Sequence, residues 1–309
     1  MFQPSIREFK ENHNNQLQFK SLVEYCPKNL LEEVDLVRIT TSLKQDQKQK
    51  GRLGQFLTPA PVAELMAGMF DKFGSQISLL DPGAGCGSLL AAFVVNLCNS
   101  QKCPRSLHIV AYEIDPFLIR YLRYTLELCT RECQIAGISL SYEIRNTDFI
   151  QDTVRLLQFN SLDNPDYSKF THAIVNPPYL KINAHSKVRA LLRTLGLETS
   201  NLYTGFMAAT AQLLKLGGEL VAISPRSFCN GVYFRDFRRM FLEMMAFKQI
   251  HLFESRQEAF SDDEVLQETI VIHAIKQKQK FENVVISTSS SAKDDFVLSN
   301  SFGNKLFKP

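Results

Sequence analysis

The chain alternates between short apolar runs and longer stretches in which apolar residues recur at helical spacing. Short apolar runs that end at polar residues predict buried strands, and the longer amphipathic stretches predict helices. Because the two kinds of segment alternate, the pattern predicts an α/β fold in which helices pack on a sheet. Strands are expected at 78–81, 107–113, 140–145, 172–175, 219–224, 249–253 and 269–275.

The two ends of the chain depart from this pattern. Residues 1–27 are polar and weakly patterned, and they suggest no role. Apolar residues at helical spacing between Pro27 and Lys48 predict a helix. After Lys276 the chain becomes polar and rich in hydroxyl side chains, as linkers and domain edges are. The chain is therefore divided into an N-terminal helical extension, a central domain, and a linker or the start of another domain, at 1–50, 51–280 and 281–309.

Composition places the chain among soluble globular proteins. Hydrophobic residues make up 45% and charged residues 22% of its 309 residues, and the formal net charge is only +3. A nucleic-acid partner would therefore need basic residues gathered on one surface. The longest apolar stretch, near 89–95, is far shorter than the ~20 residues of a membrane span. No membrane partner is expected.

The cysteines and the N-terminus indicate a cytoplasmic location. None of the seven cysteines forms a Cys-x-x-Cys pair, and no histidine lies at a metal-ligand spacing from them. We interpret them as reduced thiols and predict no metal site. The N-terminus lacks the basic segment and apolar core of a signal peptide.

The sequence Asn176-Pro177-Pro178-Tyr179 follows the predicted strand 172–175. Each proline fixes its own φ, lacks an N–H and keeps the preceding residue out of the helical region, so the strand must end in a rigid, extended corner. The Asn176 side-chain oxygen and the Pro177 carbonyl are suited to accept both N–H groups of a planar amine and to turn its lone pair outward. Tyr179 is suited to stack on a base. A simple turn that caps a buried strand is the alternative.

Two earlier segments are suited to hold a ligand. A strand, a glycine-rich turn and a helix are predicted around Asp81 to Gly87, and such a turn brings the backbone close to a ligand. The turn lacks the full dinucleotide spacing, which argues against a nicotinamide cofactor. Upstream, Thr58 is predicted to be the N-cap of a helix that begins at Pro59, and its free N–H groups suit a ligand carboxylate.

The next two predicted strands end in acidic residues. Glu113 ends the second strand, the position at which an acid bonds a ribose hydroxyl pair in such folds, and Ile114 is expected against an adenine ring. Asp115 is expected to cap the following helix. Asp148 is suited to accept from an adenine amino group, with Phe149 beside it, although a lone Asp in a loop is usually a turn residue.

In their order, these segments resemble the S-adenosylmethionine-dependent N6-adenine DNA methyltransferases of type II restriction–modification systems. The order is that of the gamma arrangement: Gly-x-Phe-x-Thr-Pro, Asp-Pro-x-x-Gly-x-Gly, the acidic strand end, Asp-Phe and Asn-Pro-Pro-Tyr, within about 51–276. The resemblance implies a Rossmann-like class I methyltransferase fold, with a mostly parallel seven-stranded sheet and helices on both faces. It implies catalysis by Asn176, Pro177, Pro178 and Tyr179. It implies S-adenosylmethionine bound by Thr58, Asp81, Gly83, Gly85, Gly87, Glu113, Ile114, Asp148, Phe149 and Asn176.

The same resemblance implies direct methyl transfer to an adenine rotated out of double-stranded DNA. Lys181, Lys187, Arg189 and Arg226 are candidate nucleic-acid contacts, although a solvated helix face explains them equally well. A cognate restriction endonuclease or a separate DNA-recognition domain is the expected partner, so this chain alone is expected to bind DNA weakly and with little selectivity. A second aromatic that would stack on the base is unassigned, with His273 and Phe228 as candidates.

Two other functions fit parts of the sequence. Asn-Pro-Pro-Tyr also occurs in methyltransferases that act on a glutamine amide of translation release factors, because that amide poses the same lone-pair problem. The Gly-x-Phe-x-Thr-Pro segment and the long region after Tyr179 favour DNA. A non-catalytic nucleic-acid-binding subunit is the other alternative, and the intact Asn176 and Tyr179 argue against it.

Overall fold

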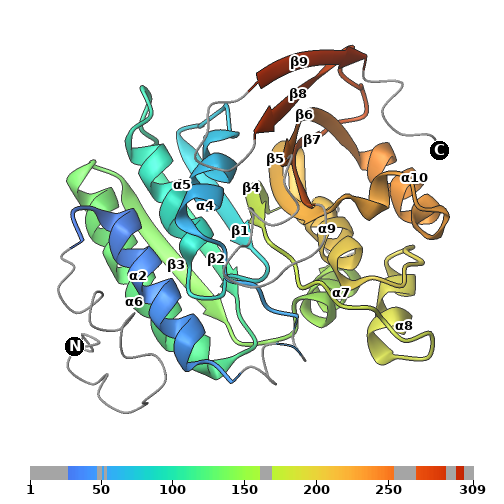
Figure 1. Cartoon of the computed structure of the whole chain (residues 1–309), viewed down its shortest axis with the longest axis horizontal. Helices are drawn as coiled ribbons and strands as arrows, with labels where there is room; N and C mark the ends of the chain where they lie inside the picture. The colour runs from blue at the N-terminus through green and yellow to red at the C-terminus, as the bar shows by residue number, and fades with distance from the viewer. Residues whose placement is uncertain are drawn as a thin grey trace.

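The predicted strands assemble into one sheet, with helices arranged on both of its faces (Figure 1). The computed structural model describes residues 27–46, 51, 54–160, 169–253, 269–289 and 297–302. The strands are β1 (Gln76–Asp81), β2 (Ser106–Tyr112), β3 (Ser139–Arg145), β4 (Phe170–Val175), β5 (Leu214–Pro225), β6 (Met245–Phe253), β7 (Thr269–Lys276), β8 (Asn283–Ser289) and β9 (Val297–Phe302). The α-helices are α2 (Leu30–Lys44), α4 (Ala60–Gly68), α5 (Ser88–Cys98), α6 (Pro116–Ile135), α7 (Phe149–Asn160), α8 (Lys187–Thr194), α9 (Leu202–Leu213) and α10 (Arg235–Met244).

The order of the strands creates a crevice where the site is expected. The sheet runs β3-β2-β1-β4-β5-β7-β6-β8-β9. From β1 the chain adds β2 and β3 on one side, and it then returns to add β4 and β5 on the other. In open α/β sheets, ligands bind beyond the carboxyl ends of the strands at such a reversal. The ends of β1 and β4 flank this point, and the Asn176 corner directly follows β4.

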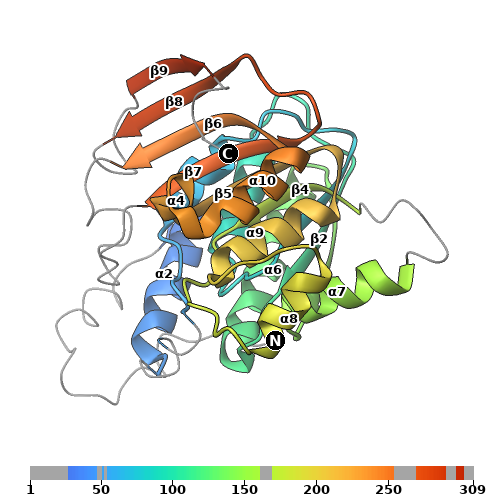
Figure 2. The same ribbon diagram turned by 90° about the vertical axis from the view of Figure 1, so that its right-hand side faces the viewer.

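The sheet is mostly parallel, as predicted, but it has nine strands among the described residues where seven were expected. The pairs β5–β7, β6–β7 and β8–β9 are antiparallel, and the remaining pairs are parallel. The two additional strands, β8 and β9, continue the sheet past β6 (Figure 2).

The segment 281–309, interpreted from its hydroxyl side chains as a linker or the start of another domain, thus contains two strands of this sheet. Ser287 and Ser289 are buried, and their hydroxyls lie 2.9 and 3.1 Å from Nδ1 and Nε2 of His251 on β6. A buried polar side chain is tolerated when it is hydrogen-bonded, so hydroxyl-rich residues can form an inner strand here.

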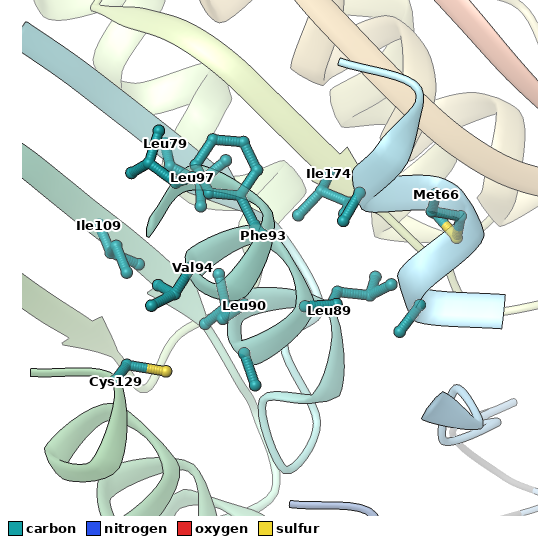
Figure 3. Close-up of a cluster of buried hydrophobic side chains, with 14 of the residues drawn as sticks. Met66, Leu79, Leu89, Leu90, Phe93, Val94, Leu97, Ile109, Cys129 and Ile174 are labelled. Carbon is teal, nitrogen blue, oxygen red and sulfur yellow. The ribbon is translucent and has the colours of Figure 1, made fainter. Parts of the chain in front are cut away.

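The strands alternate their side chains between two cores, as the period of a strand requires. On β1, Leu79 faces one core and Leu80 the other, and on β4 Ile174 and Val175 divide in the same way. The first core is covered by α5, whose apolar side chains pack on β1, β2, β4 and α4 (Figure 3). Each large apolar side chain buried there contributes about 1.5–3 kcal/mol. The fully buried side chains of α5 include Leu90, Phe93, Val94 and Leu97.

The N-terminal helix predicted between residues 27 and 48 is confirmed as α2. Asn29 caps it by accepting a hydrogen bond from the Glu32 N–H at 3.0 Å. The helix lies alongside α5 and α6 (Figure 1), and Leu30 and Val34 join the first core. This packing makes the extension part of the central fold. Within the described residues, every helix is too short or too polar to cross a membrane.

Candidate active site

A cavity lies at the carboxyl ends of β1, β2 and β4, where the strand order reverses. Its walls come from the loop before α4, the glycine turn after β1, the acidic end of β2, the loop after β3, the Asn176 corner and α9. Eight predicted site residues line it together: Gly83, Gly85, Glu113, Ile114, Asp148, Phe149, Asn176 and Pro178. The cavity therefore joins the candidate cofactor residues to the candidate catalytic residues.

The glycines of the turn serve two different purposes. Gly85 has a φ of +56°, and a Cβ built there would lie 2.9 Å from Leu57 Cδ2. Gly87 has a φ of +94°, and its Cβ would lie 2.8 Å from Thr125 Cγ2 on α6. Both need the left-handed backbone that glycine adopts freely. Gly85 lines the cavity. Gly87 does not line it, but its lack of a side chain lets α6 pack closely against the start of α5.

Asp81 holds the glycine turn from within the protein. Its side chain is fully buried, and its Oδ1 accepts a hydrogen bond from the Gly83 N–H at 3.2 Å. Within the described part of the chain, Oδ2 has no partner. Burial raises the pKa of Asp81 to about 8, because an ionised carboxylate there would lose its hydration.

Glu113 connects the glycine turn to the end of β2. Its carboxylate accepts from the Gly85 N–H at 2.9 Å and from the Asp115 N–H at 2.7 Å. Burial raises the pKa of Glu113 to about 7, although these backbone hydrogen bonds oppose the shift. The prediction that Asp115 caps α6 is confirmed, since its Oδ1 accepts from the Phe117 N–H at 2.9 Å.

The side chain of Asn176 is held in one orientation by two neighbours. Its Nδ2 donates to the Phe56 carbonyl and to Thr58 Oγ1, each at 2.9 Å. A carbonyl can only accept, so the amide nitrogen must face Phe56 and the oxygen must face away from it. Among the described residues, no donor contacts Oδ1. Asn176 thus presents an acceptor at the cavity wall.

The predicted cap at Thr58 is wrong. The helix begins at Ala60, with Pro59 as its N-cap and without a side-chain cap. The Ala60 N–H donates instead to Asp35 Oδ1 of α2 at 3.1 Å. Thr58 is buried, and its hydroxyl accepts from Asn176, so it is not available to cap the helix. The side chain that accepts from the first helical N–H, Asp35, lies 25 residues earlier in the chain, and local sequence does not reveal this contact.

Tyr179 is fixed beside a second aromatic ring. Its N–H donates to the Gly54 carbonyl at 3.3 Å, and its ring centroid lies 5.6 Å from that of Phe56 at an interplanar angle of 35°. The Tyr203 ring meets the Tyr179 ring edge-on, with the centroids 6.3 Å apart. Pro177 is buried beneath this corner. The half-buried Tyr179 ring is therefore positioned by aromatic contacts and by a backbone hydrogen bond.

The two sequence candidates for a second stacking aromatic are wrong. His273 and Phe228 are each 1% exposed. His273 lies 2.8 Å from Glu219, and Phe228 packs edge-on against Phe237. Phe56, which was not considered for this role, lines the cavity instead. Its place in the Gly-x-Phe-x-Thr-Pro segment was the available signal.

Asp148 serves as a helix cap at the cavity wall. Its Oδ1 accepts from the Gln151 N–H at 2.7 Å, at the start of α7. The turn role expected of a lone Asp is therefore present, and Asp148 still lines the cavity next to Phe149. The Phe149 ring packs against Phe206 of α9, with centroids 5.2 Å apart, and Ile114 is 49% exposed at the rim. This end of the cavity combines apolar walls with one carboxylate.

The basic residues near the corner differ in their exposure. Lys181 and Arg226 are exposed. Lys187 donates to the Gln151 side chain at 3.2 Å. Arg189 is only 19% exposed and forms a salt bridge with Glu198, so its guanidinium is already engaged.

The chain is similar to methylases of restriction–modification systems and to type II methyltransferases. Residues 108–260 match the model of the Eco57I restriction-modification methylase family. The type II methyltransferase M.PstI of Providencia stuartii is 42% identical over 262 residues, which are 84% of this chain and 50% of the relative. The type II methyltransferase M.BsuBI of Bacillus subtilis is 44% identical over 276 residues, 88% of this chain and 52% of the relative. The chain thus spans about half the length of these curated relatives.

A solved structure supports the fold. A Listeria monocytogenes protein, described as a class I S-adenosylmethionine-dependent methyltransferase, superposes with a TM-score of 0.61. The match covers 90% of this chain and 79% of that protein at 15% identity. The chain therefore has the class I methyltransferase fold that its motifs predict.

Proposed function

We propose that this chain, which is related to the DNA methyltransferases of restriction–modification systems, methylates the exocyclic N6 of an adenine flipped out of double-stranded DNA. It would act as the modification component of such a system. The observation that carries this proposal is the orientation of Asn176, whose amide nitrogen is engaged and whose oxygen is left for a substrate amine.

The fold and the relatives indicate S-adenosylmethionine as the cofactor, and the cavity residues fit it. Gly85 lines the cavity without a side chain of its own, which would place the turn backbone beside the methionine part. The Glu113 carboxylate suits the ribose hydroxyls, and the exposed side chain of Ile114 suits the adenine ring, with Asp148 near its amino group. When bound, the cofactor supplies an electrophilic methyl group on a sulfonium.

The Asn176 corner would prepare the target amine. The lone pair of an exocyclic amino group is delocalised into its ring, which makes the amine a poor nucleophile. Asn176 Oδ1 and the Pro177 carbonyl would accept its two hydrogens and draw the nitrogen toward tetrahedral geometry. Because both acceptors are held before the substrate arrives, little reorganisation is needed during the reaction.

The aromatic pair would hold the flipped base. Tyr179 and Phe56 lie beside the corner, and stacking on an aromatic side chain contributes about 1–3 kcal/mol per base. A base that has left the duplex must be held by such contacts while its amine is oriented. Lys181, Lys187 and Arg226 would contact DNA phosphates, and Arg189 would contribute only by giving up Glu198. A recognition domain or a cognate restriction endonuclease would be the partner.

The proposal is tested by supplying radiolabelled cofactor with duplex DNA or with a release-factor peptide that contains glutamine. We expect label in DNA, recovered as N6-methyladenine after digestion, and none in the peptide. Transfer to the peptide, transfer to cytosine, or no transfer by the intact protein would overturn the assignment. The Asn176→Ala variant serves as the inactive control.

A further inference from the structure

Residues 54–58, which we call the bridging segment, run between two halves of the cavity. The cofactor half is formed by the glycine turn and Glu113, and the other half is formed by the Asn176 corner. One side of the segment contacts the catalytic corner. Its Gly54 carbonyl accepts from the Tyr179 N–H at 3.3 Å. The Phe56 carbonyl and the Thr58 hydroxyl both accept from Asn176. Alternate residues of the segment thus hold the corner.

The intervening residues contact the cofactor half. Gln55 Nε2 donates to Glu113 Oε1 at 3.2 Å. Leu57 is 5% exposed, and it packs so closely on Gly85 that no Cβ fits there. The same five residues therefore touch the glycine turn and its acid on one side and Asn176 and Tyr179 on the other. A shift of the bridging segment at the glycine turn would therefore also move its contacts with Asn176 and Tyr179.

The amide of Gln55 is fixed by a chain of hydrogen bonds. Gln45, at the C-terminal end of α2, donates from Nε2 to Gln55 Oε1 at 2.7 Å. Gln55 then donates from its own nitrogen to Glu113. Gln45 is 6% exposed, and among the described residues its Oε1 has no partner. A buried amide with an unpaired oxygen destabilises the fold, so its presence needs an explanation.

We propose that Gln55 is a positioning residue that couples ligand occupancy at Glu113 to the position of the bridging segment, and thereby to the orientation of Asn176. A ligand hydroxyl that donates to Glu113 competes with Gln55 or shifts it, and the segment carries that change to the corner. Cofactor binding then favours the arrangement that captures the target base. This inference rests on the proposed function, because it assigns the cofactor to Glu113 and the base to Asn176.

Coupling between two sites is measured as the factor by which one ligand changes the affinity for the other, and it commonly lies between about 5-fold and 150-fold. The experiment uses the 309-residue chain and a duplex with 2-aminopurine in place of the methylated adenine, whose position is found by sequencing DNA that this chain has methylated. Base capture is followed by 2-aminopurine fluorescence, with and without the unreactive product S-adenosylhomocysteine. The affinity of the chain for S-adenosylhomocysteine is measured by calorimetry, with and without DNA.

For the natural chain we expect each ligand to tighten the other by about tenfold. In Gln55→Met, which keeps the length but removes both hydrogen bonds, each ligand should still bind, and the coupling should fall below about twofold. Gln249→Met is the matched control, because Gln249 donates to Ser287 on the far strands and lies outside the site. Its coupling should remain at the natural value.

A coupling factor near one in the natural chain, or an unchanged factor in Gln55→Met, would overturn this inference. If Gln55→Met does not fold, Gln45→Met provides the same test, because it removes the brace and leaves Gln55 in place. Retained tenfold coupling in that variant would also overturn it. If instead no adenine is methylated by the natural chain, the proposed function fails before this experiment begins.

Discussion

Titratable side chains are buried at both ends of the parallel strands, but the two ends use them differently. At the carboxyl ends, Glu113 lines a cavity, and Asp81, buried behind the glycine turn, keeps an oxygen without a partner among the described residues. At the amino ends, the buried side chains of His172, Glu219 and His273 form a cluster that lines neither of the two described pockets.

The amino-end cluster is hydrogen-bonded internally, although among the described residues His273 Nδ1 has no partner. Glu219 Oε2 lies 2.8 Å from His273 Nε2 and accepts from the Asp71 N–H at 3.3 Å. His172 donates from Nε2 to the Lys72 carbonyl at 2.9 Å, and burial lowers its pKa. Burial of titratable groups therefore does not identify a site by itself. A titratable group with a raised pKa that also lines a cavity, as Glu113 does, is the stronger indication of a site.

The largest effect is expected at the corner. Asn176→Ala should lower kcat by about 10²–10³, the range for loss of one preorganised hydrogen-bonding group. Cofactor affinity should change less than about twofold, because Asn176 contacts the bridging segment rather than Glu113. Single-turnover kinetics and calorimetry measure the two quantities. If kcat and cofactor affinity fell by the same factor, the corner would have a structural role.

At the opposite end, His273→Phe should affect stability only. The variant leaves the buried Glu219 carboxylate with one fewer partner, which should lower the free energy of unfolding by about 2–3 kcal/mol. Urea unfolding measures this loss. The kcat of the folded fraction should match that of the natural chain, and a reduced kcat at unchanged stability would place this cluster in the catalytic machinery.

Tyr179→Ala should weaken the capture of the flipped base by about 10-fold to 100-fold, since a stacked ring contributes about 1–3 kcal/mol. Tyr179→Phe keeps the ring and loses only a hydroxyl contact of 3.5 Å to the Ile223 carbonyl. It should therefore behave like the natural chain. Base-analogue fluorescence distinguishes the variants, and equal loss in both would assign the effect to the hydroxyl.

Glu113 should make cofactor affinity depend on pH. Its pKa is raised to about 7, so without ligand the folded chain loses stability as pH rises from its ordinary value of 4.5 through about 7. Ligand hydroxyls favour the ionised form, so cofactor affinity should increase through the same pH range.

Glu113→Gln should bind the cofactor about tenfold more weakly at pH 8 and nearly as well at pH 6, as calorimetry would show. Asp81, whose pKa is about 8, would contribute the pH dependence that remains above pH 7. An unchanged pH profile in the variant would remove Glu113 from cofactor binding.

Local patterns predicted the fold and the principal walls of the site. The strand that ends at Asp81, the acid at Glu113 and the corner at Asn176 were visible because each depends on residues adjacent in sequence. The same logic missed β8, where Ser287 is accommodated by His251 from another strand. Polar residues in a strand are predictable only when their partners are known.

The contacts that orient the Asn176 side chain were not predictable from the sequence. Asn176 is held by Thr58, 118 residues away, and Gln55 meets Glu113 across 58 residues. Thr58 followed by Pro59 is typical of a helix start, and only the fold shows that Asp35 has taken that role. Tertiary hydrogen bonds decided between two locally reasonable uses of one hydroxyl.

Thr58→Val is the most direct test of whether the bridging segment orients the Asn176 amide. The substitution keeps the shape of Thr58 and removes one of two acceptors for Asn176 Nδ2. If the segment does orient the amide, the single-turnover methylation rate should be about fivefold to tenfold lower, corresponding to one hydrogen bond of about 1–1.5 kcal/mol, and cofactor affinity should not change. An unchanged rate, or an equal loss of cofactor affinity, would contradict that role.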